Sequence, residues 1–295
     1  MEIEKYIQAG KIAAKVLKYA SSLAKENASL LEIAESIEKK IVQLGGKPAF
    51  PANICINHIA AHDTPLHDDK RVLCKEDLVK IDIGVHIDGY IADCAISLQV
   101  NTNKHSKLIQ ASENALANVI KNLTPGTKLF EIGEIIEKEI TSLGFSPIRN
   151  LSGHEIDCYN LHAGLTIPNY NNGNKKLLPK AFAIEPFATP GSGIVIEGKP
   201  SGIYMLLEAK PVRNVHAREI LKFIAENYKT LPFAKRWLVK KFGLLKTNLA
   251  LLALEKEKVV KQFSTLVEKS KQPVSQKEHT FVIKEDKVIV TTLGD

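Results

Sequence analysis

The sequence predicts an α+β fold with a central antiparallel sheet flanked by helices. Two observations predict it: helical patterns are segregated from β-hairpins along the chain, and strands and helices do not alternate regularly. Segregation of this kind is typical of antiparallel sheets, whereas alternating units build parallel ones. The clearest hairpin turns at Asp88-Gly89, a dipeptide that favours a two-residue turn between strands. We therefore expect a single domain over residues 1–295.

Four helices and this hairpin are predicted in the first half of the chain. Ser29 with Glu32 forms a capping-box start for the second helix, and Gly45-Gly46 ends its apolar pattern. The first two helices are expected within residues 1–45, the hairpin at 78–98, and the other helices at 104–123 and 129–143.

The second half is expected to combine short strands with a helical insertion. A strand is predicted at 181–187, and the chain ends in a hairpin with strands 280–283 and 288–292. Residues 211–271 have a helical pattern, and we interpret them as a subdomain inserted between strands. They carry a basic cluster that could be a solvated helical face or an RNA contact: Lys235, Arg236, Lys240, Lys241 and Lys246.

Composition excludes several classes of protein. The net charge of +7 and the hydrophobic content of 44% are ordinary for a globular chain of 295 residues. No apolar run reaches the ~18–20 residues of a transmembrane helix, and the charged N-terminus lacks the apolar core of a signal peptide. We therefore expect a cytoplasmic protein that binds neither membranes nor DNA. Its cysteines are expected to be small buried side chains: Cys55, Cys74, Cys94 and Cys158.

Two aspartates are predicted to converge in the hairpin. If Asp88-Gly89 is the turn, Asp82 faces Ala95, and Asp93 lies on the same side two residues away. Diagonal neighbours of this kind have Cβ atoms within roughly 8 Å. Two carboxylates that converge among apolar residues repel unless a cation or a proton lies between them. A shared divalent metal is one interpretation; one solvated and one hydrogen-bonded acid is the other.

Five further residues have local settings that suggest chemistry. His62, His154 and His162 lie in loop-like segments, the last two beside glycines, although a structural histidine would fit there as well. Glu185 is an acid within an apolar strand pattern, and Glu278 precedes the last hairpin. A salt bridge would account for either glutamate alone.

Taken in chain order, the acidic residues and His154 resemble the five-ligand dinuclear site of the methionine aminopeptidases, which have the pita-bread fold. The matching strings are Lys80-Ile-Asp-Ile-Gly84, Gly89-Tyr-Ile-Ala-Asp93, Ser152-Gly-His154, Phe182-Ala-Ile-Glu-Pro-Phe-Ala-Thr189 and Gln276-Lys-Glu-His-Thr280. Residues 231–237 resemble the helical insertion of the type 2 branch, and the short N-terminus resembles the archaeal form.

The resemblance implies hydrolytic removal of the N-terminal methionine from nascent proteins when the second residue is small. It implies that Asp93 and Glu278 bridge two divalent metals, with Asp82 on one metal and His154 with Glu185 on the other. Oxygen-rich ligands of this kind suit Mn, Fe, Co or Zn. A water activated by the two metals would be the nucleophile.

The resemblance also implies roles around these ligands. Glu185 would be the general base, while His62 and His162 would hydrogen-bond the reacting peptide group. Phe50 and Leu161 would line the methionine pocket, together with Phe263 and Ile203, although each could be ordinary core. The expected partners are nascent polypeptides, with a transient ribosome contact, and the protein is expected to be a monomer.

Two positions depart from the family pattern. Asp63 stands where many members have an aromatic residue, usually tyrosine, and Ile203 stands where some type 2 members have histidine. Xaa-Pro aminopeptidases and prolidases share the fold and ligand types, but generally have a sizeable extra N-terminal domain. A metal-free binding protein of the same fold should lack ligands, whereas this sequence has all five.

Overall fold

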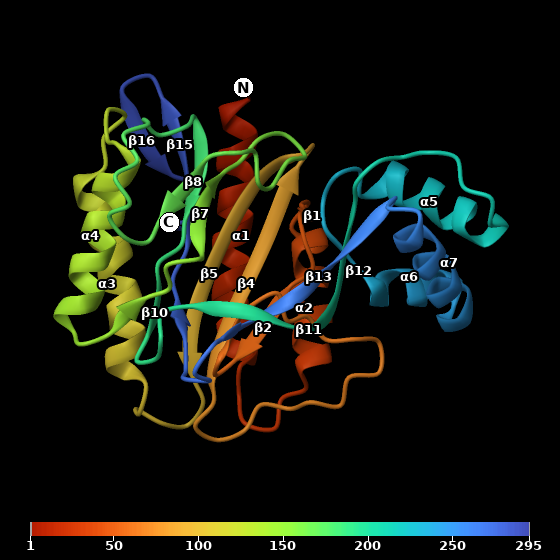
Figure 1. Ribbon diagram of the computed structural model, residues 1–295, viewed down its shortest axis with the longest axis horizontal. Coiled ribbons are helices and arrows are strands. Elements are labelled where there is room, and N and C mark those ends of the chain that lie inside the picture. Colours follow the sequence, from red (N-terminus) through yellow and green to blue (C-terminus); the bar gives the residue numbers. More distant parts are fainter. Residues whose placement is uncertain (1, 295) are drawn as a thin grey trace.

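The computed structural model describes residues 2–294, and Figure 1 shows its helices and strands. The helices are α1 (Ile3–Leu23), α2 (Leu30–Gln43), α3 (Ser106–Asn122), α4 (Leu129–Ser142), α5 (Val215–Asn227), α6 (Lys235–Phe242) and α7 (Leu244–Lys256). The strands of the first half are β1 (Lys47–Pro48), β2 (Asn53–Ile56), β3 (Ile59–Ala61), β4 (Leu78–Ile87) and β5 (Tyr90–Gln99). Those of the second half are β6 (Ser146–Pro147), β7 (Ser152–Glu155), β8 (Thr166–Pro168), β9 (Ala181–Ile184), β10 (Phe187–Thr189), β11 (Val195–Leu206), β12 (Phe233–Ala234), β13 (Val260–Glu268), β14 (Ser275–Gln276), β15 (His279–Lys284) and β16 (Lys287–Val290).

The β4–β5 hairpin has the predicted register. Ile87 pairs with Tyr90 across the Asp88-Gly89 turn, and Asp82 pairs with Ala95. Both turn residues have positive φ, +50° and +92°, as a type I′ turn requires. Helices α1 and α2 bury their apolar faces against this hairpin, and α1 lies behind it in Figure 1. The Ser29 hydroxyl accepts a hydrogen bond from the Glu32 N–H, which confirms the N-cap half of the predicted capping box.

A second antiparallel sheet lies beside the hairpin, with strand order β16-β15-β9-β7-β8. Helices α3 and α4 cover it, at the left of Figure 1. The two halves are joined by a bridge between Ala95 and Glu278 and by a 2.7 Å hydrogen bond from the Asp93 N–H to Thr280 Oγ1. The prediction of antiparallel sheets flanked by helices is confirmed, and this joint places residues of both sheets around one point.

The predicted strand at 181–187 is interrupted. Strand β9 ends at Ile184 and β10 begins at Phe187, because Pro186 has no N–H to donate to a neighbouring strand. The break turns Glu185 out of the sheet ladder.

Helices α5, α6 and α7 lie together at the right of Figure 1, between β11 and β13. They share an apolar core that includes Ile220, Leu238 and Leu254. Residues 260–268 form β13, which pairs along β11, so the expectation of helix up to residue 271 was wrong there. The assignment of 211–271 as an inserted subdomain stays a prediction.

Two sequence expectations about side-chain exposure need correction. Cys55 and Cys94 are buried as predicted, but Cys74 and Cys158 are exposed. Arg236 was grouped with the basic surface cluster, yet it is only 3% exposed because its guanidinium pairs with Glu38. Among residues 2–294, the structure has no helix long and apolar enough to cross a membrane.

Candidate metal centre

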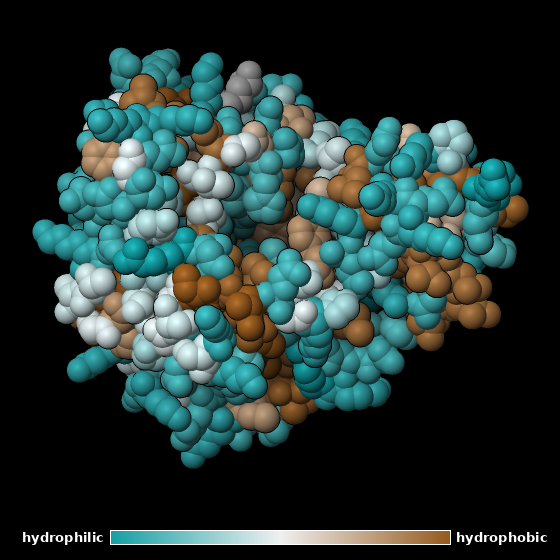
Figure 2. Space-filling model, viewed as in Figure 1, coloured by the Kyte–Doolittle hydropathy of each residue, from teal (hydrophilic) through white to brown (hydrophobic). Residues whose placement is uncertain are grey.

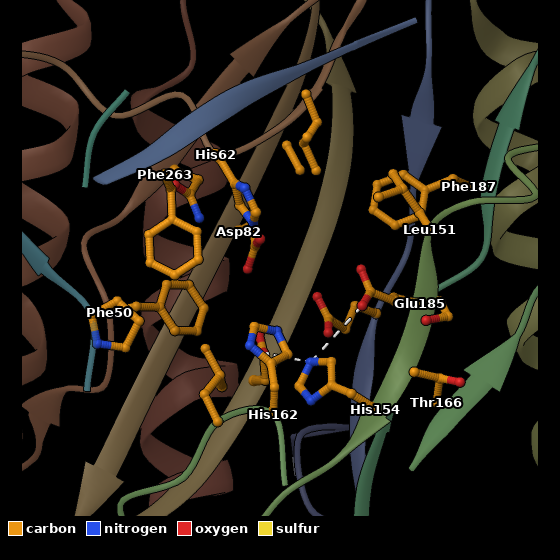
Figure 3. A pocket seen from close by; sticks show the side chains of 18 of the residues that line it. Phe50, His62, Asp82, Leu151, His154, His162, Thr166, Glu185, Phe187 and Phe263 are labelled. Carbon is orange, nitrogen blue, oxygen red and sulfur yellow. Dashed lines mark ion pairs between the residues drawn. The ribbon is translucent and has the colours of Figure 1, made fainter. Parts of the chain in front are cut away.

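The five acidic and histidine residues singled out in the sequence line one cavity of about 330 Å³, whose wall also includes residues of β3, β11 and β13. Asp82 lies on β4, Asp93 on β5, and His154 on β7. Glu185 comes from the break after β9, and Glu278 immediately precedes β15. Figure 3 shows His154 and Glu185 on neighbouring segments, with their polar atoms directed into the cavity. Residues nearly 200 positions apart in the chain thus meet at the joint between the sheets.

Their polar atoms are close enough to share a cation. One potential ligand atom from each of Asp93, His154 and Glu278 lies within 4.8 Å of the others. His154 Nε2 is 3.5 Å from Asp93 Oδ2 and 3.8 Å from Glu185 Oε1, as the dashed lines of Figure 3 mark.

The carboxylates of this centre are costly to keep charged without a cation. Burial raises the pKa of Asp93 to about 7. Burial, together with neighbouring carboxylates, raises the pKa of Asp82, Glu185 and Glu278 well above the usual value. No lysine or arginine among residues 2–294 forms an ion pair with these four acids.

Two carboxylate oxygens in the centre are buried and lack any partner among the described residues, Asp82 Oδ1 and Asp93 Oδ1. Buried acceptors are normally satisfied, so this pair calls for a donor or a cation. Carboxylates with one imidazole and no thiolate suit a divalent metal such as Mn, Fe, Co or Zn. The residues present therefore fit a metal centre.

Two amide side chains beside the acids were missed in the sequence. Asn53 on β2 pairs directly across from Asp82 on β4, and Gln276 Nε2 donates to Glu278 Oε2 at 3.3 Å. Hydrogen bonds from both amides oppose the rise in the pKa of Asp82 that burial causes. Gln276 lies two residues before Glu278, and in an extended chain residues two apart point to the same side. This spacing could have indicated that the two side chains are neighbours. Nothing marked Asn53, because β2 is short and does not alternate.

His162 and His62 border the carboxylates. The rings of His162 and His154 are 4.4 Å apart between centroids, at an angle of 69°. Burial lowers the pKa of His162 to about 3 and that of His62 to about 4. Both imidazoles are therefore neutral at pH 7, and a neutral imidazole has one N–H donor and one acceptor. His62 Nδ1 has no hydrogen-bond partner among residues 2–294.

The rest of the cavity wall is apolar. Phe50, Leu161, Ile203 and Phe263 all line it. Figure 3 shows Phe50 and Phe263 on the side of His62, with Glu185 across the cavity. Figure 2 shows that the molecular surface is hollowed near its middle, with apolar residues exposed around the hollow. The cavity thus joins a cluster of carboxylates and His154 to an apolar recess.

Comparisons with known proteins identify the family. The model of metallopeptidase family M24 matches residues 4–216. A methionine aminopeptidase of Pyrococcus horikoshii is 48% identical over 295 residues, 99% of this chain and 100% of the relative. One of Methanocaldococcus jannaschii is 45% identical over 297 residues, again 99% of this chain and 100% of the relative.

Solved structures share the fold at lower identity. A methionine aminopeptidase of Thermotoga maritima has a TM-score of 0.72 at 22% identity, covering 99% of this chain and 96% of that one. A thermophilic Arx1 has a TM-score of 0.85 at 17% identity, covering 99% and 91%. A prolidase of Pyrococcus horikoshii has a TM-score of 0.63 at 17% identity, covering 100% of this chain and 62% of that one. At these identities the likeness establishes the fold alone.

Proposed function

This chain belongs to metallopeptidase family M24 and is a metal-dependent aminopeptidase of the methionine aminopeptidase type, and we propose how its cavity removes an N-terminal methionine. The observation that carries the proposal is a cluster of four carboxylates and His154 beside an apolar recess, with Asp93 and Glu278 buried and Asp82 and Glu185 half-buried. The family model and the curated relatives confirm the predicted family and activity, and the solved structures confirm the fold. The roles of individual residues are proposals.

We propose that the five residues hold two divalent metal ions. Asp93 and Glu278 would contact both ions, Asp82 would complete one set of ligands, and His154 with Glu185 the other. When bound, metals in such a pair lower the pKa of a water and polarise the scissile carbonyl. The orphaned oxygens of Asp82 and Asp93 support this arrangement.

Glu185 is proposed to transfer a proton from the attacking water to the leaving amine. Its carboxylate lies in the cavity within 3.8 Å of His154 Nε2, so it can receive a proton from the attacking water. It would then deliver that proton to the leaving amine. An ionised carboxylate at this position can both accept a proton and return it.

His162 and His62 are proposed to bind the reacting peptide group. Both are neutral, and both line the cavity next to the carboxylates. A neutral imidazole N–H can donate to the carbonyl oxygen, where negative charge develops as the peptide bond breaks. The closeness of the His162 ring to His154 supports a position near that oxygen.

The apolar recess is proposed to take the methionine side chain. Methionine is unbranched and flexible, and it contacts aromatic rings favourably through its sulfur. Phe50 and Phe263 supply such rings, while Leu161 and Ile203 supply aliphatic walls. The second residue would lie beside His62, and we propose that it must have a small side chain.

The cellular setting is part of the proposal. We place the protein in the cytoplasm as a monomer that acts on nascent chains and contacts the ribosome transiently. The exposed lysines Lys240 and Lys241 on α6 support an anionic partner. Arg236 does not contribute, because it is buried.

Hydrolysis of short peptides tests the function. After chelation and metal-by-metal restoration, Met-Ala-Ser should be cleaved much faster than Met-Lys-Ser, and Ala-Pro should not be cleaved. Preferential cleavage of Ala-Pro would instead favour a prolidase. Full activity in protein shown to be metal-free by elemental analysis would refute the assignment.

A further inference from the structure

His62 has a backbone conformation that residues other than glycine rarely adopt. Its φ is +62°, in the left-handed region that favours glycine. A residue stays in such a conformation only where its surroundings hold it there. Because His62 lines the cavity, whatever holds its backbone also sets the direction of its imidazole.

The residue after His62 is held by a two-pronged ion pair. Arg71 Nη1 lies 2.6 Å from Asp63 Oδ2, and Arg71 Nη2 lies 3.0 Å from Asp63 Oδ1. The Asp63 side chain is only 3% exposed. A bidentate pair of this kind fixes orientation as well as distance. The same guanidinium also binds Asp69, at 2.7 Å from Nη2 to Oδ2.

The backbone around Asp63 is fixed as well. The Asp63 carbonyl accepts a 2.7 Å hydrogen bond from the Ile54 N–H, and Thr64 Oγ1 donates to the Ala52 carbonyl at 2.8 Å. The first contact ties the segment to β2, and the second ties it to Ala52, the residue before β2. These backbone contacts do not fix the Asp63 side chain. The ion pair with Arg71 does, and it thereby restrains the chain directly after the positive φ of His62.

We propose that Asp63 and Arg71 are positioning residues that aim His62 at the substrate. Neither residue is among those that line the cavity, so they act through His62 and do not touch the substrate. The inference rests on the proposed function, in which His62 binds the reacting peptide group. It assigns a role to Asp63, one of the two positions at which this sequence departs from the family pattern.

The substitution Asp63→Asn tests the proposal, with Asp69→Asn as its matched control. Each removes one carboxylate charge from Arg71, but only Asp63 follows His62. Asp63→Asn should lower kcat on Met-Ala-Ser about ten- to a hundredfold at unchanged metal content, because a small misplacement of a binding group has effects of this size. Asp69→Asn should leave kcat within about twofold of the parent.

A double variant separates positioning from stability. In a His62→Ala background, Asp63→Asn should cause no further loss of kcat, since the residue it acts through is gone. An equal loss in both backgrounds would overturn the proposal, and so would an unchanged kcat in Asp63→Asn. If Asp63→Asn does not fold, Arg71→Lys serves in its place, because it keeps the charge but loses the two-pronged geometry.

A crystal structure of Asp63→Asn gives a readout that does not depend on activity. We expect the His62 backbone to leave φ near +62° or its ring to move from the cavity wall. A His62 that stays in place in this variant would overturn the inference. A parent protein that fails to cleave Met-Ala-Ser would instead refute the proposed function, and the crystal structure would still decide the positioning role.

Discussion

Arg236 and Glu38 form an ion pair inside the protein that joins helix α6 to helix α2. Trp237 Nε1 donates to Glu38 Oε2 at 2.8 Å, and the Ala52 N–H donates to Glu38 Oε1 at 3.2 Å. The Glu38 carboxylate therefore connects α6 to the segment that follows Phe50. Arg236 Nη1 also donates to Thr64 Oγ1 at 2.9 Å, two residues after His62. The helices between β11 and β13 are thus anchored to a wall of the candidate site.

Glu38→Gln should destabilise the protein strongly. The variant leaves the Arg236 guanidinium buried without its carboxylate, and loss of one partner of a buried pair costs about 3–5 kcal/mol. The free energy of unfolding, measured by urea titration, checks this. Glu35→Gln is the control, because Glu35 meets the exposed Lys240 at 3.9 Å and should contribute less than about 1 kcal/mol. Similar losses in both variants would contradict the anchoring role of Glu38.

The Arg236–Glu38 pair also marks a limit of prediction from the sequence. Arg236 lies among four lysines, and its partner Glu38 is 198 residues away, so no local pattern could show that it is buried. Asn53 was missed for a related reason: its place opposite Asp82 depends on the pairing of β2 with β4. Strand β13 was read as helix because its burial does not alternate regularly along the chain.

Local signals, by contrast, predicted much of the fold. The Asp88-Gly89 turn determines the register of the hairpin, and that register alone places Asp82 and Asp93 near each other. The other members of the centre could not be placed by geometry. His154, Glu185 and Glu278 were identified through resemblance of their flanking residues, and the structure shows them around the same cavity.

Stability should depend on Glu268 below pH 5. Burial opposes its ionisation, but hydrogen bonds from Ser192, Ser270 and backbone N–H groups prevail and lower its pKa to about 2. Because the folded state binds this proton less readily than the unfolded state, the stabilisation is present above pH 4.5 and is lost as the pH falls toward 2. With Glu268 fully ionised, this stabilisation of the folded state is about 3 kcal/mol. Unfolding free energies between pH 2 and 6 measure it.

Glu268→Gln should flatten that pH dependence, because glutamine has no proton to bind in this range. The exposed Glu197, on the paired strand β11, gives the control variant Glu197→Gln. Its unfolding free energy should follow the parent curve. A Glu268→Gln curve as steep as the parent would show that other carboxylates cause the acid loss.

Removal of metal should lower thermal stability as well as activity. Without a cation, the four carboxylates of the centre repel one another or take up protons. A ligand at a hundred times its Kd stabilises the folded state by about 2.7 kcal/mol, which corresponds to roughly 5 °C in Tm for a protein of this size. Scanning calorimetry with chelator and with added Mn or Co measures the shift. Potassium chloride at equal ionic strength should not restore Tm; restoration by salt alone would argue against a specific centre.

Glu185→Gln should lower turnover by at least ~10²-fold, because it removes the proposed proton acceptor while keeping the side-chain shape. Steady-state kinetics on Met-Ala-Ser, with bound metal determined in parallel, measure the loss. The control is Glu134→Gln, on the exposed face of α4, which should change little. Equal behaviour of the two variants would show that Glu185 has no part in the reaction.

His162→Ala and His154→Ala should fail in different ways, although their rings are only 4.4 Å apart. His162 is proposed to donate to the substrate, so its loss should cost ~10²–10³-fold in turnover while bound metal stays at the parent level. His154 is proposed as a ligand, and its Nε2 lies 3.5 Å from Asp93 Oδ2. Its loss should weaken metal affinity, and excess metal should partly restore turnover. Titration of each variant with Mn and Co, following bound metal and turnover together, separates the cases; rescue of His162→Ala but not of His154→Ala would reverse the two roles.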